Sequence, residues 1–132
     1  MRWDIAPSNE EVTLLMEAGL AYRDAGKYQE ASDVFTGVRA LAPQSEVPEV
    51  ALGTVSFHQA DFADAVKHYN RALEVNPKSA YAHAHLGEAH LFLKDKDAAL
   101  QHLKKAVELD PRGESGKMAR SYIDFAATLE YR

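Results

Sequence analysis

The stretch "GLAYRDAGKYQEASDVF", residues 19–35, contains residue types that return at a fixed interval along the chain. Its first glycine, its last alanine and the first proline beyond it each occur again 34 and 68 residues later. The positions that share this interval are Gly19, Gly53 and Gly87; Ala31, Ala65 and Ala99; and Pro43, Pro77 and Pro111. Small and turn-forming residues locked to one period indicate three copies of a single structural unit.

Each unit is predicted to be a pair of helices. Glycine inside a helix costs about 1 kcal/mol relative to alanine, so its regular return indicates the close approach of another helix. We expect the recurring alanines to supply the small facing surface on that second helix. Short polar turns such as "DAGK" precede the second helix, and the recurring prolines end it because proline cannot continue the hydrogen-bond ladder. The chain is therefore predicted to be all-α.

This pattern resembles the tetratricopeptide repeat (TPR) family over about residues 12 to 113. The resemblance implies a right-handed superhelix of about seven antiparallel helices. The family's usual tryptophan, early in the first helix, is replaced here by Leu15, Glu49 and His83. The residues that carry the resemblance are Leu52-Gly53, Leu86-Gly87, Tyr22, the recurring alanines, Phe35, Tyr69, Ala72, Ala106 and the recurring prolines.

The chain is predicted to be a single TPR domain over residues 1–132. We divide it into an N-terminal arm and cap at 1–11, repeats at 12–45, 46–79 and 80–113, and a capping helix at 114–132. Ser8 and Glu11 form a capping-box pattern that starts the first helix. In the last segment, an apolar stripe at helical spacing is expected to cover the third repeat, and a docking site is the alternative. The stripe consists of Met118, Tyr122, Phe125 and Leu129.

Composition narrows the functional classes. The 132 residues contain no cysteine, which removes disulfides and thiolate chemistry, and the net charge of −5 disfavours a nucleic-acid surface. There is no apolar run of membrane-spanning length, so we expect a cytoplasmic protein without membrane insertion.

The histidines do not form a pattern typical of a metal site. His83 and His85 project about 200° apart on a helix, while His83 and His90 share a face that is directed at the partner helix. We expect no metal, no cofactor and no enzymatic activity.

The first helix of each repeat has a second face opposite its inward-packing residues, among them Leu15, Ala18 and Leu52. A helix with apolar residues on two sides must bury both or leave one for a partner. In TPR proteins this second face lines a concave groove, and the resemblance implies the same here, the alternative being that stacking of the repeats alone covers it. The predicted groove residues are Met16, Leu20, Arg23, Val47, Val50, Thr54, Phe57, Tyr81, Glu88, Leu91 and Phe92.

The residue types in this groove suggest what it binds. TPR domains that hold acidic chaperone tails use Lys, Asn and Arg at groove positions that here are Met16, Leu20, Ala51, Tyr81 and His85. We therefore expect an apolar extended peptide or the apolar side of a helix instead, anchored by aromatic residues such as Phe57 and Phe92. Arg23 and Glu88 would set its register.

The predicted function is that of an adaptor, scaffold or chaperone that recognises another protein without covalent chemistry. One alternative is a bacterial type III secretion chaperone of the translocator-binding class, which the chain resembles in size, acidic charge and repeat number. A second is a structural protein that forms homo-oligomers through an N-terminal arm containing Trp3 and Ile5, the alternative for this arm being that it folds back on its own first helix.

Overall fold

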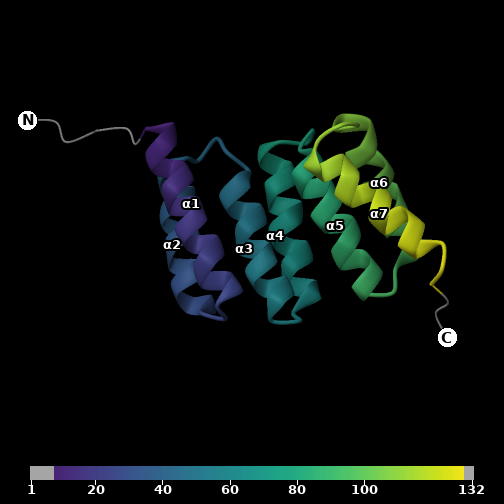
Figure 1. Cartoon of the computed structure of the whole chain (residues 1–132), viewed down its shortest axis with the longest axis horizontal. Coiled ribbons are helices and arrows are strands. Elements are labelled where there is room, and N and C mark those ends of the chain that lie inside the picture. Colours follow the sequence, from purple (N-terminus) through teal and green to yellow (C-terminus); the bar gives the residue numbers. More distant parts are fainter. Residues whose placement is uncertain (1–7, 130–132) are drawn as a thin grey trace, which may run out of the picture.

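The computed structural model describes residues 8–129, which form seven α-helices and no strand. Consecutive helices lie side by side along the long axis of the molecule, with α1 at one end of the row and α7 at the other (Figure 1). The expected all-α helical-repeat solenoid is confirmed. The helices are α1 (Asn9–Asp24), α2 (Tyr28–Leu41), α3 (Val47–His58), α4 (Phe62–Val75), α5 (Ala80–Phe92), α6 (Lys96–Leu109) and α7 (Glu114–Ala126).

The helix ends follow the local sequence. Ser8 Oγ accepts the backbone N–H of Glu11 at 3.1 Å, which is half of the predicted capping box. Asp61 and Asp95 cap α4 and α6 in the same way. Each second helix ends two residues before the proline that the sequence predicts will stop it. None of the helices within residues 8–129 combines the length and apolar character needed to span a membrane.

The turn between the two helices of each repeat contains one residue in the left-handed conformation. This residue is Gly26 in the first repeat (φ 77°), Ala60 in the second (φ 60°) and Lys94 in the third (φ 63°). Only glycine adopts this conformation without a steric cost from Cβ. The backbone of the turn is therefore the same in all three repeats, while the residue best suited to it is present only in the first.

The helices form two rows of different curvature. Helices α1, α3, α5 and α7 contact one another in series, whereas among the described helices α2, α4 and α6 make no contacts with one another. The first row therefore lies on the tighter, concave side. Its central helices are the more deeply buried: every residue of α3 from 48 to 56 is buried, but α4 buries only Ala65, Tyr69 and Ala72.

The recurring glycines allow close packing, although not against the expected partner. A Cβ atom built on Gly53 would lie 2.3 Å from Cε1 of the Tyr69 ring, and the glycines of the first and third repeats face Phe35 and Leu103 equally closely. The prediction that the recurring alanines supply the facing surface was wrong about the nearest contact, although in the third repeat the backbone oxygen of Ala99 lies 3.1 Å from a Cβ built on Gly87. The alanines are fully buried, but the space left by each glycine is filled by a large side chain four residues further along the second helix.

The first helix is more open than the sequence suggests. Leu15 and Ala18 were expected to pack inward, yet both are exposed. The equivalent of Ala18 in the second repeat, Leu52, is buried because it packs into the core of the repeat before it, next to Phe35. Within residues 8–129 no helix precedes α1 to cover it in the same way. Trp3 and Ile5 lie outside the described residues.

Candidate functional site

The predicted groove residues lie on the concave row, but the free protein already covers many of them. Val50, Thr54, Glu88 and Leu91 are buried. Partly buried positions are Met16, Leu20, Arg23, Phe57 and Tyr81, while Val47 and Phe92 are exposed. Packing between neighbouring first helices therefore covers part of the predicted groove surface. The most open part is the C-terminal end of α5, where Phe92 is half exposed.

Three phenylalanine rings meet at this open part. The Phe92 ring, which is 50% exposed, lies edge-on to Phe57 with 5.0 Å between centroids and stacks on Phe62 at 4.9 Å. Phe57 and Phe62 are in turn 5.0 Å apart. These contacts hold the orientation of Phe92 while leaving half of it uncovered. Phe62 is absent from the predicted groove residues because it begins a second helix, and the prediction considered only the first helix of each repeat.

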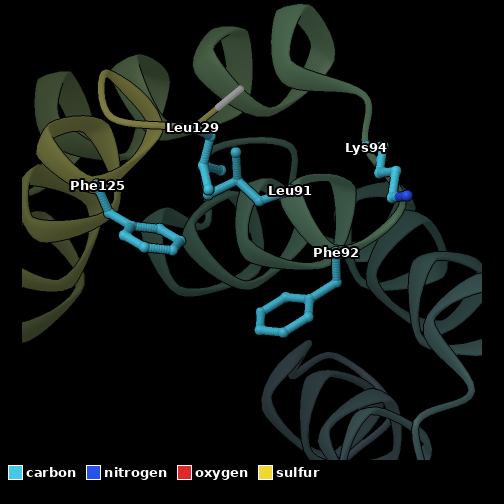
Figure 2. Close-up of a pocket in the computed structure, with 5 residues that line it drawn as sticks. All are labelled: Leu91, Phe92, Lys94, Phe125 and Leu129. Carbon is cyan, nitrogen blue, oxygen red and sulfur yellow. The ribbon is translucent and has the colours of Figure 1, made fainter. Parts of the chain in front are cut away.

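An apolar pocket of about 230 Å³ adjoins this cluster. Its lining residues are Leu91, Phe92, Lys94, Phe125 and Leu129. Figure 2 shows the Phe92 ring from α5 and the Phe125 ring from α7 on the two sides of the opening, with Leu91 and Leu129 between the two helices. Lys94 is the only charged residue in this lining, so the pocket suits an apolar group.

Phe125 belongs to the stripe that was predicted to cap the third repeat. Most of that stripe does so: Met118, Tyr122 and Leu129 pack against the core formed by α5, α6 and α7. Phe125 is different, since its side chain remains 49% exposed. It lies 34 residues after Leu91, so α7 takes the place of the first helix of a further repeat and extends the concave face.

Two of the predicted groove residues, Arg23 and Glu88, form polar contacts between helices. Arg23 on α1 donates to Thr54 Oγ1 on α3 at 2.8 Å and forms an ion pair of 2.8 Å with Asp24. Further along, the Glu88 carboxylate accepts a hydrogen bond from the Tyr122 hydroxyl and lies 3.2 Å from Nδ1 of His85. Burial and this carboxylate raise the pKa of Tyr122. The first contact links the first two repeats, and the second links α5 to α7.

The histidines that invited a metal hypothesis form packing contacts. His83 Nε2 donates to the Pro77 carbonyl at 3.1 Å, so its Nδ1 accepts from Nδ1–H of His102, also at 3.1 Å. His90 stacks on His102 at 5.8 Å. Burial lowers the pKa of His83 and, with the neighbouring imidazoles, lowers that of His102 to about 4. Within the described part of the chain, no group of three or more metal-ligating side chains is found.

Comparison with known proteins agrees with this architecture. Residues 50–114 match the family model described as tetratricopeptide repeat. The first TPR of Spaghetti (RPAP3), solved with the HSP90 peptide SRMEEVD, is 25% identical, with a TM-score of 0.71 over 94% of this chain and 99% of that one. The chain is a tetratricopeptide repeat protein. Among curated protein sequences, none matches it significantly.

Two bacterial chaperones have the same fold as this TPR protein. SycD, the type III secretion translocator chaperone of Yersinia enterocolitica, is 18% identical, with a TM-score of 0.78 over 92% of each chain. PcrH, solved in complex with the chaperone binding region of PopB, is 19% identical, with a TM-score of 0.73 over 91% of this chain and 97% of that one. At these identities the likeness concerns the fold.

Proposed function

We propose that this TPR protein is an interaction module that binds an apolar segment of a partner protein on its concave face, with the pocket between Phe92 and Phe125 as the anchor. The observation that carries the proposal is the pair of half-exposed rings at the mouth of an apolar pocket. Aromatic side chains in such positions supply most of the energy in many protein interfaces.

The size of the exposed apolar surface supports this role. A phenylalanine side chain presents on the order of 200 Å², so covering the exposed halves of both rings contributes about 5 kcal/mol before the costs of association. The Phe57–Phe62–Phe92 cluster orients one ring in advance, which reduces the entropy lost on binding. An apolar side chain of the partner, placed between Phe92 and Phe125, fits these observations.

Known TPR complexes offer a precedent and a contrast. The TPR of Spaghetti (RPAP3) was solved with an acidic peptide, SRMEEVD, and PcrH with regions of PopB and PopD. In this chain the positions that hold acidic tails in other TPR domains contain no lysine, asparagine or arginine, and Glu88 is among the predicted groove residues, so an acidic tail is disfavoured. Function as a type III secretion chaperone is a narrower form of the proposal, and self-assembly through residues 1–6 stays a separate prediction.

The test is affinity capture from a lysate of the native host with three forms of the protein. The first is the wild type, and the second carries Phe92→Glu and Phe125→Glu in the pocket. The third is a matched control with Leu41→Glu and Val75→Glu, which changes residues of similar exposure (50% and 45%) at the ends of outer helices. Circular dichroism of each form checks that helicity is retained.

We expect a partner that is captured by the wild type and the control but lost, by at least tenfold in affinity, from the pocket variant. Equal capture by all three folded forms would contradict binding at the pocket. If only the control variant failed to capture the partner, the binding surface would lie on the outer helices instead.

A further inference from the structure

Glu88 is a buried carboxylate without a permanent cation beside it. The residue is 8% exposed and lies on α5, one turn before Phe92. Its oxygens contact the Tyr122 hydroxyl and Nδ1 of His85. Within residues 8–129 its only ion-pair partner is this imidazole, which is a cation only when protonated. Burying a carboxylate costs free energy unless a positive charge compensates for the lost hydration. A permanent cation placed beside Glu88 would therefore stabilise it.

The Tyr69 hydroxyl provides a second, independent observation. Tyr69 has no exposed surface, and its hydroxyl has no hydrogen-bond partner among the described residues. Its ring lies 5.7 Å from that of His85, the neighbour of Glu88. After desolvation, the charge of Glu88 is the largest influence that raises the pKa of Tyr69, and Glu88 also raises the pKa of Tyr81. The Tyr122 hydroxyl therefore contacts the Glu88 carboxylate, and the hydroxyls of Tyr69 and Tyr81 lie within range of its charge.

The other charge in the groove is already balanced. Arg23 lies close enough to lower the pKa of Tyr69 and Tyr81 in part, but its guanidinium binds Asp24 and Thr54. Arg23 and Asp24 together contribute no net charge. Among the predicted groove residues, this leaves Glu88 as the charge without a permanent counter-charge, beside tyrosine rings whose faces and hydroxyls attract cations. Lys94, in the lining of the neighbouring pocket, is positively charged and forms no ion pair with Glu88.

We infer that the segment bound in the groove carries a lysine or arginine that pairs with Glu88 beside the apolar group held by Phe92 and Phe125. This inference rests on the proposed function and specifies the partner's chemistry. Glu88 and Phe92 are four residues apart on one helix face, which is about 6 Å along the axis. An extended ligand therefore places its basic residue two positions from its apolar anchor, and a helical ligand places it three or four positions away.

The test begins with selection of random peptides, displayed on phage, on the wild-type protein. The pocket variant (Phe92→Glu, Phe125→Glu) shows which of the selected peptides bind in the groove. A selected peptide is then synthesised with a fluorescent label, in its original form and with its basic residue replaced by glutamine. Fluorescence anisotropy gives the affinities of both peptides for the wild type and for Glu88→Gln.

We expect groove-dependent peptides to be enriched in lysine or arginine at the stated spacing. Replacing that residue should weaken binding to the wild type about tenfold, and most of this difference should vanish in Glu88→Gln. If Glu88→Gln does not fold, the affinities of the two peptides for the wild-type protein still decide the test. Groove-dependent peptides that lack basic residues, or that bind equally well after the replacement, would overturn the inference and leave the proposed function standing. Selection of no peptide sensitive to the pocket variant would overturn both.

Discussion

Repeats 46–79 and 80–113 place different side chains at equivalent positions of the same helix pair. In the first of them, Glu49 and His68 form an acid–imidazole contact of 2.9 Å. In the second, His83 and His102 occupy these positions and form an imidazole–imidazole contact of 3.1 Å. The two repeats keep the same backbone, so these two interior positions accept different hydrogen-bonded pairs.

The glycine contact differs between the same two repeats, and its disruption should have the largest effect. An alanine at 53 meets the rigid ring of Tyr69, whereas an alanine at 87 meets the more adaptable side chain of Leu103. We expect Gly53→Ala to lower the free energy of unfolding by about 2–3 kcal/mol and Gly87→Ala by about 1 kcal/mol, as measured by urea denaturation.

A double variant serves as the control for this steric explanation. Adding Tyr69→Leu to Gly53→Ala reproduces the contact that Gly87→Ala makes with Leu103 in the third repeat and should recover part of the lost stability. Equal destabilisation by both alanines, or no recovery in the double variant, would show that the glycine contact does not distinguish the repeats.

The imidazole pair should make the third repeat sensitive to acid. The pKa of His102 is lowered to about 4 from an ordinary value of 6.5, and that of His83 is also lowered. Between these values the unfolded chain binds more protons, so the pair stabilises the fold above pH 6.5 and loses this contribution as the pH falls toward 4. After allowance for partial solvent exposure, we expect a loss of about 1–2 kcal/mol.

The variant His83→Glu tests this acid sensitivity directly, because it gives the third repeat the glutamate–histidine pair that Glu49 and His68 form in the second repeat. The carboxylate should favour protonated His102, so the difference in unfolding free energy between pH 7 and pH 5 should become smaller than in the wild type. Other titrating groups are common to both proteins and cancel in the comparison. An unchanged or larger difference would contradict the assignment of acid sensitivity to the imidazole pair.

A smaller effect is expected at the turn that both repeats share. Ala60 and Lys94 have positive φ, where the first repeat has Gly26. Ala60→Gly should raise the free energy of unfolding by about 0.5–1 kcal/mol, because relief of the left-handed strain exceeds the added entropy of the unfolded chain. Ala63→Gly, at an exposed position inside α4, is the matched control and should be destabilising instead. Destabilisation by both substitutions would argue against strain at the turn.

The sequence predicted the fold well because the features that determine it are periodic. A 34-residue interval of glycine, alanine and proline predicted helix pairs, and the prolines and Ser8 marked helix ends that the structure confirms. These signals depend on local sterics and hydrogen bonding. The capping role of the last helix followed from its apolar stripe in the same way.

The openness of the groove was harder to predict. Periodicity assigns Thr54 and Glu88 to the concave face, but whether they are covered depends on how closely neighbouring first helices approach. The exposure of Phe125 depends on how α7 packs on α5. The link between Glu88 and Tyr122 spans one repeat interval, so it becomes visible only when α7 is recognised as the continuation of the concave row.

The most direct test of binding at the pocket is hydroxyl-radical footprinting of the protein, free and in complex with its captured partner. Mass spectrometry then reports the solvent accessibility of individual side chains. We predict that Phe92 and Phe125 become protected on binding, while Leu41 and Val75, equally exposed on the outer helices, keep their reactivity. Protection of Leu41 and Val75 with no change at Phe92 and Phe125 would contradict recognition on the concave face.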